Sequence, residues 1–542
     1  MRTGFTTLGC FVGYLLFGCA ANANILPQLG RRAGCEDFAT YSTRPEGRHR
    51  AGPRAPLHAP ARRVPHIQQH RGRGRPRNIV PRMKDPDLAR YTTRLTCPPR
   101  KCKRTLFQAV REHVPQHARH DYKVVRRQPR VRHHRGHPRG VAARLEQPVQ
   151  GVSPACRRGR EAAAAHAGVI NLQARYITQY PYCNAFQPPP ESGLPPQCCS
   201  GDTGAKISPP DNMNIVWTCG YELDSLLSFL QLSRTYYQYS QDRSIFTFNN
   251  SVWFSAVEAI MQVIEDQAVP TYDAAGNVIS FYNISGPNQQ YMKNDGRGPP
   301  KADTGLVGTT YRPSDDVVAF PYNIPHQAMA VVELRGLAAL LQAVGMRPDL
   351  RSAAAARADT VEAALWRWGT VLTKDWGEVF AYEVDGYGGA AIQDDPNVPS
   401  LVSIPYLGFA NNTNAIYANT RRMVLSPQGN PYYGFGPVIR GVSSPHVDEK
   451  HVWPMGLITE VVTGSDDADI LVKLEYLKNT TTGLGLIHES VNTHNVADYT
   501  RPWFAWANSY FAETILQLAE TKPHLLFADG KPFKVSDVLT NL

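Results

Sequence analysis

The stretch Leu223-Asp-Ser-Leu-Leu-Ser-Phe-Leu230 indicates the fold, because its leucines stand at positions i, i+3, i+4 and i+7. This spacing places them on one apolar face of an α-helix. Similar apolar faces recur at Leu337–Val344 and Val361–Trp368. A last helix is predicted to begin near Thr500, with Pro502 tolerated in its first turn. We therefore expect a largely helical chain.

Long loops rich in Gly, Pro, Asp and Tyr separate these predicted helices. They span residues 270–325, 384–412, 425–453 and 483–500. Loops of this length within a compact domain usually carry function. Long helices joined by such loops predict an α-helical barrel or toroid with its site at one mouth.

The positive charge of the chain is confined to one segment. Between Arg48 and Arg160, 26 Arg and 4 Lys stand against 5 acidic residues, a net charge of +25. The whole chain carries +12, so the remainder carries −13. Read literally, the basic segment predicts a disordered arm that binds nucleic acid or another polyanion. The acidic remainder argues against that partner.

The N-terminal residues are typical of a secretory signal peptide. Arg2 supplies the charged start, Leu8–Gly18 a short apolar run, and Ala21-Asn-Ala23 a cleavage site. The run is short for a bilayer span, so an uncleaved anchor is the less favoured alternative. We predict a secreted or secretory-pathway protein that has no membrane attachment after cleavage.

Glycosylation tripeptides and cysteines agree with the secretory route, although such tripeptides often arise by chance. The tripeptides begin at Asn249, Asn283, Asn411 and Asn479. The candidates for disulfides beyond the signal are Cys183, Cys198, Cys199 and Cys219. The sequence leaves the pairing of these cysteines open.

Residues 48–160 lack apolar periodicity, and a shifted reading frame explains them better than a disordered arm. With synonymous codons read one nucleotide later, His134–Gln150 can encode Thr-Gly-Asp-Ile-Arg-Gly-Val-Trp-Leu-Arg-Asp-Ser-Ser-Asn-Gln-Phe. The same shift gives Val110–Val124 a peptide that contains Asn-Thr-Leu-Asp-Thr-Thr, and it gives the residues up to His166 an amphipathic, helix-like pattern. A single shift that restores several ordinary segments predicts a frame error.

Three loop segments concentrate carboxylates, aromatic side chains and rigid turns. They are Tyr311-Arg-Pro-Ser-Asp-Asp316, Tyr382-Glu-Val-Asp-Gly-Tyr-Gly388 followed by Asp394–Ser400, and His488-Glu-Ser490 followed by Thr500–Asn508. Glycosidic bond cleavage requires a carboxylic acid that protonates the departing oxygen. It also requires a second carboxylate that activates water or attacks the sugar. These segments could supply both groups.

Neighbouring carboxylates such as Asp315 and Asp316 can push one another's pKa apart, which helps to keep a proton available near neutral pH. The alternative is that such pairs cap helices or hold turns. This alternative fits Asp394 and Asp395, which stand directly before Pro396.

Other chemistries find little support in the sequence, which has no zinc motif, phosphate-binding loop or Cys-x-x-Cys pair. Four histidines near one another could bind a metal ion, but scattered loop histidines are more often ordinary polar groups. They are His446, His451, His488 and His494. We predict neither a metal nor another cofactor.

Taken together, seven motifs resemble glycoside hydrolase family 125, whose members are exo-acting α-mannosidases. The motifs are Tyr311–Asp316, Asp395–Leu401, Tyr406-Leu-Gly408, Asn430-Pro-Tyr-Tyr433, Ser444-Pro-His446, His488-Glu-Ser490 and Thr500–Asn508. The resemblance covers residues 168–525, and the shifted-frame peptides resemble the family's N-terminal motifs. This sequence differs slightly from the family's usual motifs at Phe320–Pro325 and at Ser490. Some family members have Gly at the position of Ser490.

The resemblance implies an all-α (α/α)6 toroid, the six-hairpin glycosidase fold, with an N-terminal part that the frame error leaves incomplete. It implies metal-independent hydrolysis of α-1,6-mannosides with inversion. The implied general acid is Asp315, with Asp316 as the next choice, and the implied general base is Glu489. The implied sugar contacts are Asp316, Arg312, Tyr311, His446, His488 and Trp503. Glu222 and Asp224 either line the mouth or lie on a helix surface.

We therefore predict a signal peptide at 1–23, a largely mistranslated and disordered segment at 24–167, and a glycoside hydrolase domain at 168–542. The expected partners are mannose-containing glycans rather than nucleic acid. Two alternatives remain: a folded but inactive relic, and a secreted protein whose basic arm binds polyanions.

Overall fold

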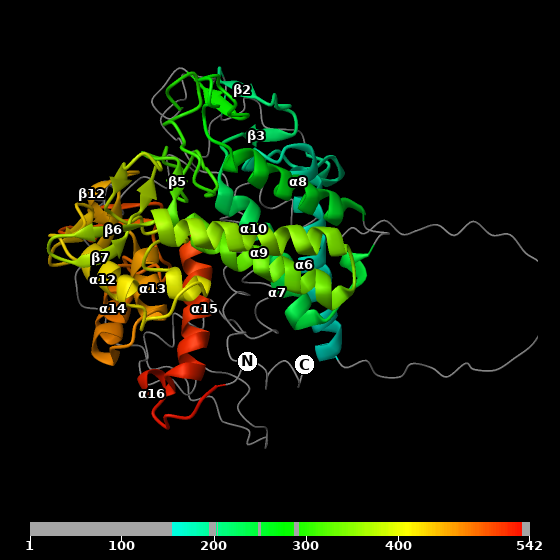
Figure 1. Cartoon of the computed structure of the whole chain (residues 1–542). Coiled ribbons are helices and arrows are strands. Elements are labelled where there is room, and N and C mark those ends of the chain that lie inside the picture. Colours follow the sequence, from blue (N-terminus) through cyan, green and yellow to red (C-terminus); the bar gives the residue numbers. More distant parts are fainter. Residues whose placement is uncertain (1–153, 195–201, 203, 248–250, 287–291, 534–542) are drawn as a thin grey trace, which may run out of the picture.

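The computed structural model describes residues 154–194, 202, 204–247, 251–286 and 292–533, and its main elements are helices (Figure 1). The first five helices are α6 (Pro154–Gln179), α7 (Leu223–Ser240), α8 (Ser251–Ala268), α9 (Ile324–Val344) and α10 (Pro348–Trp368). The remaining helices are α11 (Ile404–Leu407), α12 (Ala415–Val424), α13 (Pro454–Val462), α14 (Asp467–Asn479), α15 (Ala505–Thr521) and α16 (Pro523–Leu526). Two short 3-10 turns are η2 (Pro190–Ser192) and η3 (Ser244–Phe246).

The three helices predicted from leucine and valine spacing are present as α7, α9 and α10. Local signals fix the ends of α9: the side chain of Asn323 accepts a hydrogen bond from the His326 N–H group, and Gly345 ends the helix with a φ of 74°. An Asn side chain satisfies a free N–H group at a helix start, and Gly adopts the left-handed conformation at little cost.

The predicted start of the last helix, near Thr500, is wrong. Helix α15 begins at Ala505, and Thr500 lies in strand β14 (Tyr499–Thr500). The Thr500 carbonyl accepts a hydrogen bond from the Glu489 N–H group, and Arg501 has a φ of 51°. Tertiary pairing therefore holds this segment out of the helix, and the Phe504 N–H group bonds to the Ile487 carbonyl before the helix starts.

The helices form two groups in space (Figure 1). Helix α9 packs along α10 and against α7, while α6 packs against α7 and α8. Helix α13 packs against α14 and α15. Helices α13 and α14 lie on the other side of the molecule, and α15 lies at the edge of this second group that faces the first (Figure 1). Each group has a buried apolar cluster, and Val398 and Tyr406 pack against both clusters.

Small antiparallel sheets organise the long loops. Two-stranded sheets pair β1 (Ala185–Phe186) with β3 (Val216–Thr218), β2 (Lys206–Ser208) with β4 (Asn283–Ser285), and β6 (Thr370–Thr373) with β7 (Gly377–Phe380). A three-stranded sheet has the order β5 (Tyr322–Asn323), β8 (Glu383–Val384) and β9 (Ala390–Ala391). A five-stranded sheet has the order β10 (Tyr433–Phe435), β11 (Arg440–Ser444), β12 (Asp448–Val452), β13 (Ser490–Asn492) and β14.

Among the described residues, α9 is the one helix with the length and apolar composition of a membrane span. More than half of its apolar window is buried inside the protein. Since α9 packs against α7 and α10, these properties are also those of a core helix. The predicted signal peptide at 1–23 lies outside the described residues.

One disulfide joins Cys183 to Cys219, 36 residues along the chain. Cys183 follows α6, and Cys219 follows β3, so the bond ties the end of the first described helix to the loop that leads into α7. Cys198 and Cys199 lie outside the described residues. The bond thereby settles the pairing of two of the four candidate cysteines.

Candidate active site

Asp315 and Asp316 project from a tight turn in the loop before β5. The Arg312 N–H group donates to the Asp316 carbonyl over 2.8 Å, and the Asp315 N–H group donates to the Arg312 carbonyl over 3.0 Å. Asp315 has a φ of 68°, a left-handed conformation that Asp adopts more readily than most residues. The two neighbouring carboxyl groups consequently meet different partners: Asp316 meets His446, and Asp315 meets Glu222.

A buried ion pair supports this turn. Arg312 donates from Nε to Oε1 of Glu383 over 2.6 Å and from Nη2 to Oε2 over 3.0 Å. The same Oε2 accepts hydrogen bonds from the N–H groups of Ala319 and Phe320. Glu383 is fully buried and Arg312 is 5% exposed. The predicted role of Arg312 as a sugar contact stays a prediction, and its bonds favour a supporting role.

Asp394 and Asp395 hold turns, as the alternative interpretation of this pair predicted. Asp394 accepts from the N–H groups of Leu401 and Val402. Asp395 accepts from Ser314 Oγ over 2.8 Å and from Ser444 Oγ over 3.0 Å. Asp395 therefore links the turn that carries Asp315 to the strand that precedes His446.

His446 lies in the turn between β11 and β12, with its Nδ1 atom 3.0 Å from Oδ1 of Asp316. Burial lowers the pKa of His446. The hydrogen bond to Asp316 and the negative charges of Asp316, Asp315 and Glu489 outweigh burial and raise this pKa to about 9. The ring is therefore a cation at neutral pH, held among three carboxyl groups from two other loops.

Asp315 has an exposed side chain, yet the protein around it restricts its hydration enough to raise its pKa. The charges of His446 and Arg501 and a hydrogen bond with Glu222 act in the opposite direction, while the charge of Glu489 adds to the increase. Burial and the charges of Asp315 and Asp224 raise the pKa of Glu222 well above its ordinary range. The surroundings of both acids therefore disfavour their charged forms.

Glu489 lies directly before β13 and is 6% exposed. Its Oε1 atom lies 3.2 Å from Nε of Arg501, the residue directly after β14. The pairing of β13 with β14 brings these two residues together, because Ser490 lies opposite Thr500 in the register. Glu489 therefore has a cationic neighbour, and its charge reaches both Asp315 and His446.

His488 is fully buried, and both of its ring nitrogens have protein partners. Nδ1 lies 3.1 Å from the Arg501 carbonyl oxygen, and Nε2 lies 3.1 Å from Thr482 Oγ1. The ring stacks on Tyr499 with centroids 3.8 Å apart. Burial lowers the pKa of His488 to about 4, so the ring is neutral. These contacts favour a role in holding the Glu489 loop, and its predicted sugar contact is untested.

The other sequence-predicted residues take three different positions. Tyr311 is 8% exposed, and its ring lies beside Gly220. Trp503 is half-buried and lies two residues after Arg501. Asp224 is fully buried, with Oδ1 3.1 Å from His326 Nε2, so the helix-surface alternative for Asp224 is wrong.

Sequence reasoning did not single out Arg501 or Glu383 as site residues. Arg501 lies within the Thr500–Asn508 motif, and Glu383 lies within the Tyr382–Gly388 segment, so both belong to the predicted loop segments. Their partners are 12 and 71 residues away, respectively. Only the folded arrangement could pair them, because no local pattern specifies such contacts.

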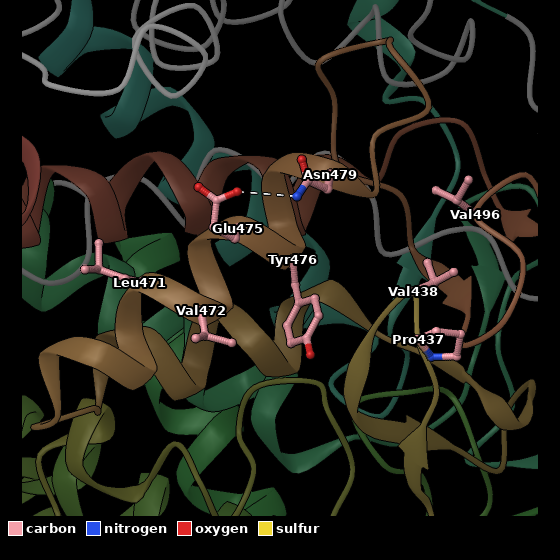
Figure 2. Close-up of a pocket in the computed structure, with 8 residues that line it drawn as sticks. All are labelled: Pro437, Val438, Leu471, Val472, Glu475, Tyr476, Asn479 and Val496. Atoms are coloured by element: carbon pink, nitrogen blue, oxygen red, sulfur yellow. Dashed lines mark hydrogen bonds between the residues drawn. The ribbon is translucent and has the colours of Figure 1, made fainter.

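A surface groove beside α14 has a mainly apolar wall, unlike the loops that carry the acids (Figure 2). Its wall includes Leu471, Val472, Pro437, Val438, Val496 and Tyr476. The carboxylate in this groove, Glu475, is exposed and bonds to Asn479. With a single carboxylate and a mainly apolar wall, this groove does not have the two acids that glycosidic bond cleavage requires.

Metal ligation has no support from the part of the chain that the structure describes, where no three His, Cys, Asp or Glu side chains form a group suited to a metal ion. The four candidate histidines contact separate partners instead: Asp316 for His446, Asp448 for His451, Thr482 for His488 and Thr493 for His494. The carboxylates around His446 therefore remain the main chemical feature of the described residues.

Helices that surround loop-borne carboxylates are consistent with a glycosidase of the α/α-toroid class. Residues 148–516 match the family of metal-independent α-mannosidases known as GH125. This match covers more than half of the chain, so the protein belongs to glycoside hydrolase family 125. The resemblance stated from the sequence motifs is confirmed.

Two relatives carry the comparison further. The meiotically up-regulated gene 157 protein of Schizosaccharomyces pombe is 46% identical over 367 residues, which are 66% of this chain and 70% of that protein. A structure of a metal-independent α-mannosidase from Streptococcus pneumoniae, in a non-productive complex with α-1,6-mannobiose, matches with a TM-score of 0.60 and 29% identity. That match covers 66% of this chain and 80% of the other.

Proposed function

We propose that the protein is an inverting exo-α-1,6-mannosidase with Asp315 as general acid and Glu489 as general base. In this reaction Asp315 protonates the glycosidic oxygen as the bond to the anomeric carbon breaks. Glu489 accepts a proton from the water that attacks the same carbon from the opposite face. The observation that carries the proposal is the different environments of the two carboxyl groups, which belong to separate loops.

Asp315 is a better general acid than Asp316 because of their partners. The pKa of Asp315 is raised, as an acid that must hold a proton near neutral pH requires. Asp316 instead has its Oδ1 atom 3.0 Å from Nδ1 of His446, so this oxygen already has a protein partner. Glu489 lies on a separate loop, with its Oε1 atom 3.2 Å from Nε of Arg501.

The choice of substrate rests on the family and on the Streptococcus pneumoniae structure, which holds α-1,6-mannobiose. The test is to incubate the full chain with α-1,6-, α-1,3- and α-1,2-mannobiose and to measure released mannose. Faster release from the α-1,6 isomer, unaffected by a chelator, is the expected result. Equal rates on all three isomers would contradict the linkage, and no release from any isomer would contradict the activity.

A secretory location is part of this proposal, and two features support it. The Cys183–Cys219 disulfide is typical of proteins that fold in an oxidising compartment. The tripeptide at Asn411 is exposed, with Thr413 Oγ1 donating to Asn411 Oδ1 over 2.6 Å. A glycosyltransferase could therefore reach this side chain in the secretory pathway.

The frame error also remains a proposal, because residues 48–153 lie outside the described part of the chain. Helix α6, which the structure describes from Pro154, crosses the predicted domain start at residue 168. Sequencing the transcript across codons 48–170 tests the proposal directly. A one-nucleotide difference would restore the missing part of the toroid, whereas a transcript that confirms the printed frame would favour the inactive relic.

A further inference from the structure

The groove beside α14 has no part in the proposed reaction (Figure 2). It has a volume of about 550 Å³, which lies in the range of small-ligand sites. Leu471 and Val472 on its helix side are 45% and 49% exposed. Pro437 and Val438 line it from a second segment, between β10 and β11. Contiguous apolar surface of this kind typically marks a site at which another molecule binds.

The helix side of the groove also carries an acceptor for an N-linked glycan. Val472, Glu475, Tyr476 and Asn479 have the spacing i, i+3, i+4 and i+7, so they share one face of α14. Asn479 is exposed, ends the helix and begins the tripeptide Asn479-Thr-Thr481. Of the tripeptides within the described residues, this is the one whose asparagine lines the groove.

The amide nitrogen of Asn479 can carry a sugar and keep its protein contact. Its Nδ2 atom has two N–H bonds, and one donates to Oε2 of Glu475 over 3.4 Å. The other can be exchanged for a bond to a sugar. Glu475 is the charged residue among those that line the groove, and its Oε1 atom already pairs with Lys478 Nζ over 2.7 Å. A neutral occupant therefore fits the groove better than an ion.

We propose that Asn479 carries an N-linked glycan whose first N-acetylglucosamine lies in the groove, an inference that rests on the proposed secretory location. The donor is an oligosaccharide joined to a lipid by a diphosphate, and a glycosyltransferase of the host catalyses the transfer. The bond from Asn479 Nδ2 to the anomeric carbon forms as the bond from that carbon to the diphosphate oxygen breaks. The diphosphate keeps the electron pair, and the amide nitrogen loses one proton.

The neighbours of Asn479 suit the first sugar of such a glycan. A pyranose ring has C–H faces that pack on aromatic rings, and half-buried Tyr476 lies three residues before Asn479 on the same helix face. Pro437 and Val438 add apolar surface for the acetyl methyl group. Attachment makes these contacts intramolecular, so even weak contacts are well populated. An attached sugar therefore covers the groove more readily than a diffusible partner.

The first test measures whether Asn479 is modified. The full chain is produced in a eukaryotic host behind that host's own signal peptide, and peptides of the secreted protein are analysed by mass spectrometry. The peptide that contains Asn479 should carry a glycan. Asn479→Gln should lose it, and Thr481→Ser, the matched control, should keep it because Ser also completes the tripeptide. An unmodified Asn479 in the secreted protein would overturn the inference, whatever the state of Asn411.

The same host separates this inference from the proposed location. If residues 1–23 of the chain do not direct secretion but Asn479 is modified behind the host signal, the location fails and the glycan site stands. If residues 1–23 direct secretion and Asn479 stays unmodified, the inference fails alone.

The second test measures whether the glycan covers the groove. Hydroxyl radicals label aromatic side chains that water can reach. The label on Tyr476 should be lost in the glycosylated chain and regained in Asn479→Gln. Asn411→Gln is the matched control, because it removes a tripeptide outside the groove and should leave Tyr476 protected. Equal labelling of Tyr476 in the wild type and in Asn479→Gln would overturn the covering, because the glycan would then point into solvent or a different molecule would fill the groove.

Discussion

His446 Nδ1 lies 3.0 Å from Asp316 Oδ1, and this contact joins two loops that are 130 residues apart in the chain. Asp395 strengthens the same junction, because it accepts hydrogen bonds from Ser314 in one loop and Ser444 in the other. The junction places a cation beside the turn that carries both acids. The protonation state of His446 therefore affects the charge around both acids.

The pKa of His446 is raised above its ordinary value of 6.5 to about 9, which gives a pH prediction. Because the folded protein binds this proton more tightly than the unfolded chain, His446 contributes stability that is fully present below about pH 6.5. That contribution is lost as the pH rises through about 9. NMR titration of the imidazole should show a midpoint near 9, with the signal assigned by its absence in His446→Gln. A midpoint at or below 6.5 would contradict the ion pair.

Asp315→Asn and Asp316→Asn should differ in how their activity depends on the leaving group. Loss of a general acid typically costs about 10²–10⁴-fold in rate. We expect that loss for Asp315→Asn on α-1,6-mannobiose, with a smaller loss on aryl mannosides that have acidic leaving groups. Asp316→Asn should slow both substrates by similar factors and lower the pKa of His446. The opposite pattern would assign the acid to Asp316.

Glu383→Gln should destabilise the fold, because it leaves the Arg312 guanidinium buried without a counter-charge. Breaking a buried ion pair in this way costs roughly 3–5 kcal/mol. Denaturant unfolding of the variant would measure the loss. Glu449→Gln provides the control, because Glu449 is exposed and lies 3.9 Å from exposed Lys450. Equal stability of the two variants would show that the Arg312–Glu383 pair does not support the turn.

Asn411 should carry an N-linked glycan when the chain is made in a eukaryotic secretory host. The side chain is exposed, and Thr413 bonds to its carbonyl oxygen. Enzymatic deglycosylation should lower the mass of the wild-type protein and convert Asn411 to Asp. Asn411→Gln removes the acceptor and should lose that mass difference. Intracellular retention of an unmodified protein would contradict the secretory route.

The sequence predicted those elements that local patterns determine. Leucine spacing located α7 and α9, and short motifs placed Asp315, Glu489 and His446 in loops. It did not predict that Arg501 pairs with Glu489, because their contact depends on the register of β13 and β14. Nor did it predict the late start of α15, where pairing across the sheet overrides the helical pattern that begins near Thr500.

Burial was equally hard to predict from residue type alone. A histidine next to a proposed base suggests a ligand contact, yet His488 is buried and bonded on both ring nitrogens. An acid on the first turn of a helix suggests a surface position, yet Asp224 faces His326 inside the protein. Both positions follow from tertiary packing, which a single sequence does not specify.

Glu489→Gln should abolish turnover and preserve the fold. The amide keeps the size of the side chain but cannot accept the proton of the attacking water. Circular dichroism and thermal unfolding should match the wild type within about 1–2 kcal/mol, since the neighbouring Arg501 is itself partly exposed. Turnover at the wild-type rate would show that Glu489 is not the general base.

The stereochemistry of the released sugar tests the central claim most directly. Proton NMR can follow the anomeric signals while the full chain hydrolyses the methyl glycoside of α-1,6-mannobiose, from which free mannose comes only from the non-reducing end, before the two anomers of that mannose equilibrate. Because water attacks the face opposite the leaving group, we predict that β-mannose appears first and α-mannose forms later by mutarotation. Initial release of α-mannose would contradict the assignment of Asp315 and Glu489 as an inverting pair.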